Sequence, residues 1–241
     1  MCGRMVLEAS REAIGRLFRI KLDGPYAPRF NVAPSEPVLH VHTLFGAPQF
    51  DFARWGLIPH WHKDPSVAQM LINARIETVL DKPSFRAGIR HRRVLVPATH
   101  FYEWQREGKL KQPYAVNRKQ PDGEEGLFAF AGIVDEWAGK DGGELTTLAL
   151  LTQQADGEVA KIHHRMPVVV PPDHYADWLD CMGISSDTAV ARLREPIPDA
   201  WQLWPVDGAV NRGGVDGPGL LEPVEIAAPK PPKPDPQLDL F

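Results

Sequence analysis

Residues 127–153 read LFAFAGIVDEWAGKDGGELTTLALLTQ, and this stretch decides the fold. It contains two apolar runs, 127–137 and 145–153, rich in aromatic, β-branched and other apolar residues. The segment between them carries glycines and an aspartate, which are typical of turns. The pattern therefore predicts two antiparallel strands joined as a hairpin.

The same strand pattern recurs elsewhere in the chain. Five further strands are expected, at 37–44 (PVLHVHTL), 49–56 (QFDFARWG), 92–98 (RRVLVPA), 99–105 (THFYEWQ) and 113–118 (PYAVNR). Helices are expected at 10–20, 156–163, 172–180 and 185–195, each beginning at or just after an Asp or Ser that favours a helix start. We therefore predict an α+β fold of mainly antiparallel sheets that curl toward a barrel, with flanking helices.

The chain divides into a domain and a tail. Its 241 residues are 43% hydrophobic, enough for one core, and we expect residues 2–226 to form a single domain. Residues 227–241 read AAPKPPKPDPQLDLF, with five prolines. Proline lacks a backbone donor and favours extended chain, so we expect a disordered tail that ends in QLDLF.

Composition excludes several classes of protein. No apolar run approaches the roughly 18 residues that a membrane span needs, and the first residues do not resemble a signal peptide, which predicts a cytoplasmic protein without membrane contact. Cys2 and Cys181 are too few for a disulfide framework. The pairs His40 with His42 and His60 with His62 have no acidic or thiol partner nearby, so they are interpreted as polar residues on half-exposed strands, and we expect no metal or cofactor.

Charge is unevenly distributed along the chain. The net charge is -4, yet residues 1–100 hold 14 Lys and Arg against 8 Asp and Glu, which leaves 13 against 23 in the remainder. A local basic face can bind phosphates whatever the total charge, and Arg86, Arg90, Arg92 and Arg93 are candidates for one. From charge alone, however, a solvated surface is the better interpretation.

The chain opens with MCGR, which puts a cysteine at position 2. Removal of Met1 would leave an α-amine and a thiol on one residue, and both are partly nucleophilic near neutral pH. Such a pair can condense with an aldehyde to an imine and then close a thiazolidine ring. It can also cleave amides, with the amine acting as base. The structural alternative is a small residue at a frayed chain end.

Three other segments carry candidate partners for Cys2. In LINARIET (71–78), Asn73 and Arg75 point to the same side if the chain is extended. In PATHFYEWQ (97–105), Glu103 lies between two aromatic residues, so it is a candidate for a raised pKa and for proton transfer. The third segment is KIHHRMPVVV (161–170), in which two histidines precede Arg165.

These blocks together resemble a known family. MCGR, NVAP (31–34), RWGLIPHW (54–61), NARIET, FYEW and HHRMP occur in the order typical of SRAP proteins, the SOS-response-associated peptidases that form DNA-protein crosslinks at abasic sites. The resemblance covers roughly residues 2–210. The family fold that it implies agrees with the antiparallel α+β prediction.

The resemblance implies roles for individual residues. Cys2 would attack the aldehyde C1' of an abasic deoxyribose in single-stranded DNA, Asn73 would orient the Cys2 terminus, and Glu103 would act as general acid and base. His163, two residues before Arg165, would move protons, although His164 stands where relatives often carry an acid. The DNA contacts would be Arg4, Asn31, Pro34, Trp55, Trp61, Arg75, Arg86 and Arg165, with a place in the core as the alternative for Trp55.

The last five residues predict a second partner. QLDLF resembles the short peptide by which many bacterial replication and repair proteins bind the sliding clamp, through Gln237, Leu238, Leu240 and Phe241. A tail that folds back on the domain is the alternative. We otherwise expect a monomer, located on the nucleoid when bound to DNA. A peptidase or amidohydrolase and a non-covalent reader of modified or damaged DNA remain the alternative functions.

Overall fold

The computed structural model describes residues 2–64, 69–108, 110–118, 126–139, 142–194 and 201–226. Its strands are β1 (Met5–Leu7), β2 (Arg29–Val32), β3 (Pro37–Leu44), β4 (Ala47–Trp55), β5 (Asn73–Arg75), β6 (Arg93–Ala98), β7 (His100–Glu107), β8 (Leu110–Arg118), β9 (Phe128–Ala138), β10 (Glu144–Gln154), β11 (Arg165–Pro167), β12 (Val169–Val170) and β13 (Trp201–Pro205). Its α-helices are α1 (Arg11–Phe18), α2 (Pro83–His91), α3 (Tyr175–Leu179) and α4 (Ser186–Arg192). The predicted tail lies outside the described residues, and the assignment of 2–226 to one domain stays a prediction.

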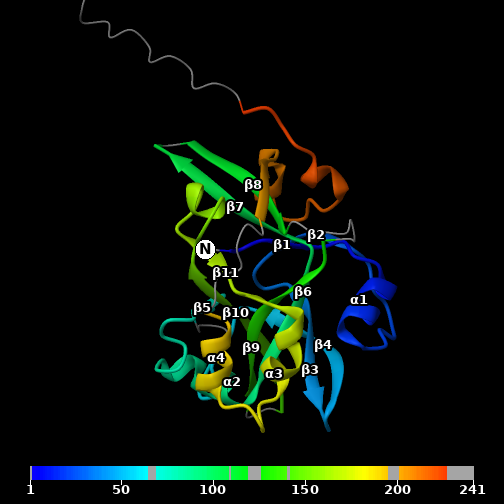
Figure 1. Cartoon of the computed structure of the whole chain (residues 1–241), viewed down its shortest axis with the longest axis vertical. Coiled ribbons are helices and arrows are strands. Elements are labelled where there is room, and N and C mark those ends of the chain that lie inside the picture. The colour runs from blue at the N-terminus through cyan, green and yellow to red at the C-terminus, as the bar shows by residue number, and fades with distance from the viewer. Residues whose placement is uncertain are drawn as a thin grey trace, which may run out of the picture.

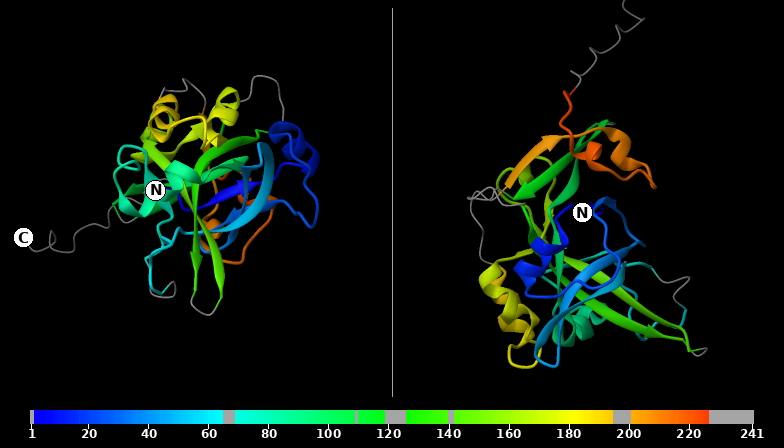
Figure 2. Two further views of the ribbon diagram at one scale, coloured as in Figure 1. Left: turned by 90° about the horizontal axis from the view of Figure 1, so that it is seen from below. Right: turned by 90° about the vertical axis from the view of Figure 1, so that its right-hand side faces the viewer.

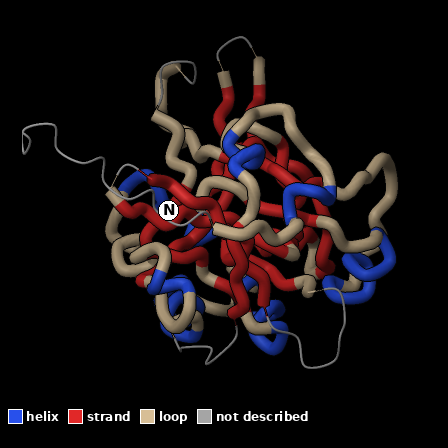
Figure 3. Tube along the Cα trace, turned by 90° about the horizontal axis from the view of Figure 1, so that it is seen from above, coloured by secondary structure: helices blue, strands red, loops and turns tan. Residues whose placement is uncertain are grey.

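All seven strands predicted from the sequence are confirmed, and five of them close a barrel. β9 pairs with β10 over Glu144↔Ala138 to Leu150↔Gly132, the hairpin expected from residues 127–153. The ring continues from β9 through β6, β3 and β4, and a parallel pairing of β4 with β10 closes it. The predicted α+β class, with antiparallel sheets that curl into a barrel, is therefore confirmed. Strands occupy the centre of the molecule and helices its edge (Figure 3).

β10 is the strand on which several others meet. Beyond its pairings with β9 and β4, it pairs in parallel with β5, at Leu150↔Asn73, and antiparallel with β11, at Gln154↔Arg165. Two segments that are far apart in the sequence thus lie on either side of one strand end.

A second, five-stranded sheet lies against the barrel, in the order β13, β8, β7, β1 and β2. In Figure 1, β1 lies between the barrel below and the β7–β8 hairpin above. The described carboxyl-terminal segment, orange to red in Figure 2, lies at the same end of the molecule.

Alternate residues of β9 separate two hydrophobic cores. Ala129, Ala131 and Ile133 pack into a cluster that includes residues from all four helices. Phe128 and Phe130 face the other side and join a cluster that also contains residues of the second sheet, Phe101 among them. At Gly132, an added Cβ would come within 2.9 Å of a methyl group of Val94, so the inner side of the barrel leaves room only for hydrogen there.

The observed helices agree only in part with those predicted from the sequence. α1 begins after Ser10, whose side chain accepts a hydrogen bond from the Ala13 N–H, and Ser185 caps α4 in the same way. The helix expected at 156–163 is only a 3₁₀ turn, Val159–Lys161, and the one at 172–180 begins as a 3₁₀ turn before α3. α2 was not predicted, because its basic residues suggested a charged surface rather than a helix. No helix in the described part of the chain has the length and apolar character of a membrane span.

Arg93 corrects the interpretation of Arg86, Arg90, Arg92 and Arg93 as a solvated surface, because it is buried. Its guanidinium is buried under the Trp178 ring and donates to the backbone carbonyls of Trp178, Ile89, Asp180 and Ile184. It therefore ties α2, β6 and the end of α3 together. Arg86 and Arg90 are exposed, as expected, while Arg92 forms ion pairs with Asp135 and Glu136.

We expect Arg93→Met to lower the free energy of unfolding by about 3 kcal/mol or more, because four carbonyls lose their donor in a buried place. Urea unfolding followed by tryptophan fluorescence measures the loss. Arg90→Met, at an exposed position of α2, is the matched control and should change stability by about 0.5 kcal/mol or less. Equal stability of the two variants would contradict the structural role of Arg93.

Candidate active site

The amino-terminal segment is held in place instead of fraying. β1 pairs with β7 at Met5↔Phe101 and with β2 at Met5↔Val32. The Tyr102 N–H extends the first pairing by donating to the Arg4 carbonyl at 3.0 Å. These bonds place Cys2 inside the core, with 0% of its surface exposed.

Asn73 contacts the backbone of Cys2 directly. Its Nδ2 donates to the Cys2 carbonyl at 2.9 Å, and the Cys2 Sγ lies 3.7 Å from the Arg4 carbonyl. Asn73 is the first residue of β5, so its position is set by the pairing of β5 with β10. Its buried Oδ1 has no hydrogen-bond partner among the described residues. An acceptor of this kind is suited to a donor on Cys2 or on a ligand.

Glu103 and His163 form the acidic and basic part of the site. Glu103 lies on β7 with 1% of its surface exposed, and its Oε1 is 3.8 Å from the Nδ1 of His163. Burial raises the pKa of Glu103 from 4.5 to about 7. The carboxyl group therefore exchanges its proton near neutral pH, which is the property that a general acid and base requires.

Burial also keeps the Cys2 thiol protonated. It raises the thiol pKa, and the negative charge of Glu103 raises it further. The resting sulfur is therefore a thiol and not a thiolate, so its proton has to be transferred when the sulfur attacks.

His163 is neutral for a related reason. Burial lowers its pKa, and the positive charges of Arg106 and Arg165 lower it further. Its ring stacks on that of the exposed His164, with centroids 4.5 Å apart. The contact with Glu103 comes from His163, the histidine that the spacing to RMP favoured.

The residues predicted to contact DNA fall into two groups. Arg4 is half-buried, and its Nη1 donates to the Asn31 Oδ1 at 2.6 Å and to the Val210 carbonyl at 2.8 Å. Asn31 is buried and donates in turn to the Val215 carbonyl at 2.8 Å. These two side chains therefore hold the second sheet to the segment after β13. Pro34, which follows Asn31 closely in the sequence, is half-buried.

The second group differs in exposure. Trp55 is fully buried, and its Nε1 donates to the Ile72 carbonyl next to Asn73. Its position is therefore the one given as the alternative to a DNA contact, a place in the core. Trp61 is 56% exposed, and Arg75 and Arg86 are also exposed. Arg165 is buried and paired with Glu77. The DNA roles of these residues stay predictions.

Two residues of the site were missed from the sequence. Arg106 follows Glu103 by three positions, and its charge acts on His163. Glu77 lies in the NARIET block, and its place in that block was the only sequence feature that could have indicated a role. The spacing of Glu77 gave no indication that it pairs with Arg165.

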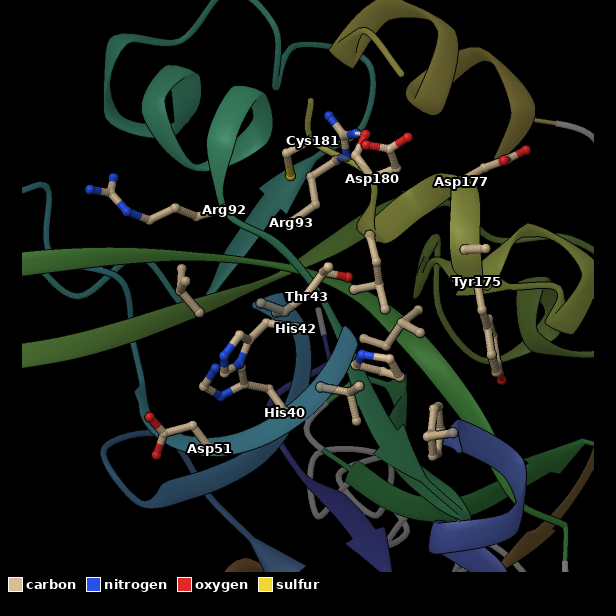
Figure 4. Close-up of a pocket in the computed structure, with 18 of the residues that line it drawn as sticks. His40, His42, Thr43, Asp51, Arg92, Arg93, Tyr175, Asp177, Asp180 and Cys181 are labelled. Atoms are coloured by element: carbon tan, nitrogen blue, oxygen red, sulfur yellow. Dashed lines mark hydrogen bonds between the residues drawn. The ribbon is translucent and has the colours of Figure 1, made fainter. Parts of the chain in front are cut away.

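A large cavity lies elsewhere in the molecule. It measures about 1300 Å³ and is lined by residues of β3, β6, α3 and the turn after α3, including His40, His42 and Cys181 (Figure 4). His40 is buried rather than half-exposed, which corrects the interpretation from its strand pattern, and burial lowers its pKa to about 4. Neither Cys2 nor the predicted catalytic residues line this cavity. Across the described segments, no three or more His, Cys, Asp or Glu side chains are grouped to hold a metal ion.

The fold and the site define a barrel protein in which a carboxamide and a carboxyl group lie near a buried cysteine at the amino terminus, with an imidazole beside the carboxyl group. The family described as "SOS response associated peptidase (SRAP)" matches residues 1–213, and the chain belongs to this family, as the sequence resemblance predicted.

Named relatives cover most of the chain. The abasic site processing protein YoqW of Bacillus subtilis is 34% identical over 226 residues, 92% of this chain and 99% of that protein. The abasic site processing protein HMCES of Gallus gallus is 36% identical over 236 residues, 86% of this chain and 70% of that protein. A crystal structure of a protein from Bacteroides thetaiotaomicron shares the fold, with a TM-score of 0.77, 23% identity and coverage of 93% and 100% of the two chains.

The buried carboxyl group predicts a pH-dependent stability. A folded-state pKa of about 7 against an ordinary 4.5 gives a contribution that is complete below about pH 4.5 and is lost as the pH rises through 7. Glu103→Gln removes this titration, so the variant should gain about 3 kcal/mol relative to the wild type between pH 4.5 and 8. Urea unfolding at several pH values measures the difference. The exposed Glu12→Gln serves as control, and a pH-independent difference for Glu103→Gln would contradict the raised pKa.

Proposed function

We propose that this protein captures abasic sites in single-stranded DNA covalently, through the amine and thiol of Cys2 after Met1 has been removed. One observation carries the proposal: Cys2 is buried in contact with Asn73, and its thiol is close enough to Glu103 for that carboxylate to raise the thiol pKa. The names of the relatives, abasic site processing proteins, supply the substrate.

The first step is the opening of the sugar. An abasic deoxyribose is mostly a closed hemiacetal, which must lose the proton of its 1'-hydroxyl and gain one on the ring oxygen before an aldehyde exists. A carboxyl group with a pKa of about 7 is present in both forms near neutral pH. Glu103 is therefore suited to give the proton to the ring oxygen and to recover one from the hydroxyl.

Capture then proceeds in two bond-forming steps. The Cys2 amine adds to C1', and the resulting carbinolamine loses one water molecule to give an imine. The thiol sulfur adds to the same carbon, and its proton passes by way of a neighbouring base to the imine nitrogen, which ends as the neutral N–H of the thiazolidine ring. Overall, an aldehyde, an amine and a thiol give the ring and one water. His163, neutral and 3.8 Å from Glu103, is placed to accept and return the protons.

Binding of the DNA requires contacts with the phosphate backbone and not recognition of a base, because an abasic site has lost its base. The exposed Arg75 and Arg86 offer positive charge, and the exposed Trp61 offers a surface for stacking. Since the adduct is covalent, a modest basic face on a chain of net charge -4 is sufficient.

A peptidase is the second candidate, favoured by the word peptidase in the family description. Cys2 would then attack an amide carbonyl with its own amine as base. Release of amines from peptide substrates without any DNA adduct would select this function. Reversible binding that survives Cys2→Ala would instead select a non-covalent reader of damaged DNA.

The adduct can be tested with an abasic oligonucleotide on denaturing gels. The wild type should form a stable adduct, and Cys2→Ala should form none without reduction. Cys2→Ala and Cys2→Ser both keep the α-amine, so an adduct of either variant should be seen only after reduction of the imine with borohydride, because no thiazolidine can form. An unreduced adduct of Cys2→Ala that resists denaturation would overturn the proposal, and intact mass should show that Met1 is absent from the reactive protein.

We further propose that residues 237–241 bind the sliding clamp, with the Pro-rich segment as tether. Full-length protein should bind purified clamp in calorimetry, and a chain ending at residue 236 should lose at least 10-fold in affinity. Leu240→Ala with Phe241→Ala is the matched variant of unchanged length. Equal affinity of all three proteins would contradict docking through QLDLF.

A further inference from the structure

Glu77 and Arg165 form a bidentate ion pair next to the proposed site. The Arg165 Nη1 and Nη2 lie 2.6 and 2.9 Å from the two carboxylate oxygens of Glu77, which is a bidentate geometry. The Arg165 side chain is 10% exposed and that of Glu77 is 46% exposed. Nη2 also donates to the Thr152 carbonyl at 2.7 Å. The hydrogen bond with Arg165 lowers the pKa of Glu77, so the carboxylate is charged in the physiological range.

The backbone of Arg165 contacts the ring of His163. The Arg165 N–H donates to the His163 Nδ1 at 3.0 Å, and the Arg165 carbonyl lies 3.0 Å from the same nitrogen. A neutral ring that accepts from this N–H carries its proton on Nε2, and a protonated ring donates to the carbonyl instead. The Arg165 backbone thus fixes the orientation of the histidine ring and offers a hydrogen bond to each of its protonation states.

The ion pair also connects two segments across β10. Glu77 follows β5, which begins with Asn73, and Arg165 begins β11, which follows His163. β5 and β11 are both paired with β10 at Thr152. The bidentate bridge therefore joins the segment that carries the carboxamide to the segment that carries the imidazole.

We infer that Glu77 is a positioning residue of the active site: by holding the Arg165 guanidinium, it fixes the Arg165 backbone against His163 and keeps that ring beside Glu103. The inference rests on the proposed function. It also means that the Arg165 guanidinium, predicted to contact phosphate, serves the site from inside the protein. Without Glu77 the buried cation loses its carboxylate partner and has to move toward water, taking the start of β11 with it.

The test uses Glu77→Gln in the full chain, with single-stranded DNA that carries an abasic site. We expect the rate of adduct formation at saturating DNA to fall at least 10-fold. Affinity for DNA carrying a tetrahydrofuran analogue, which cannot react, should be unchanged or higher because a negative charge is lost. Glu12→Gln removes the same charge from an exposed position of α1 and should react at the wild-type rate.

A double-mutant cycle separates positioning from a general structural effect. If Glu77 acts through His163, Glu77→Gln should slow the His163→Ala protein less than 2-fold. Independent, multiplicative effects would overturn the inference, as would a wild-type rate of Glu77→Gln. Thermal unfolding checks that the variant is folded, and Glu77→Asp, which keeps the charge, should recover part of the rate.

A second readout does not depend on the reaction. The ¹⁵N shifts of the His163 ring report which nitrogen carries the proton, and they should change in Glu77→Gln but not in Glu12→Gln. If the wild type forms no adduct, the proposed function fails while this measurement still tests the role of Glu77. If the wild type reacts but the ring shifts of Glu77→Gln are unchanged, only the positioning role fails.

Discussion

The pairing of the amino-terminal segment with β7 is the constraint on which the site depends. A chain end has few covalent restraints, so a residue at position 2 is ordinarily mobile. Here backbone hydrogen bonds from β7 reach Arg4 and, from Thr99, Val6, and they continue the second sheet toward the terminus. Glu103 lies on the same strand that supplies these bonds. Cys2 and Glu103 are consequently positioned by one and the same pairing.

β10 organises the other half of the site. Its last residues pair with β5 on one side and β11 on the other, which places Asn73 and the turn with His163 next to the second sheet. β10 also closes the barrel through its pairings with β9 and β4. Side chains from three separate parts of the sequence, Asn73, Glu103 and His163, are thus brought together near Cys2 from paired strands or from a turn anchored to one, a geometry that suits a reaction in which several protons move.

Burial shifts all three titrating groups of the site toward their uncharged forms. It raises the pKa values of Cys2 and Glu103 and lowers that of His163. The common cause is the cost of a charge in a poorly solvated place. In a site of this kind the thiol and the carboxyl group hold protons, and the imidazole is neutral and can accept one. It is therefore suited to condensation chemistry, in which the nucleophiles are neutral and water leaves.

The sequence by itself determined the longer strands, two helix starts and the family. Short apolar runs bounded by turn residues predicted all seven of the longer strands, Ser10 and Ser185 marked two helix starts, and six short blocks indicated the family, because these features depend on neighbouring residues only. Tertiary structure decided the rest. The parallel closure of β4 on β10, the burial of Arg93 and Trp55, and the bridge from Glu77 to Arg165 join residues that are distant in the chain. Spacing carries no record of such contacts, since they form only when packing removes the side chains from water and makes each buried polar group find a partner.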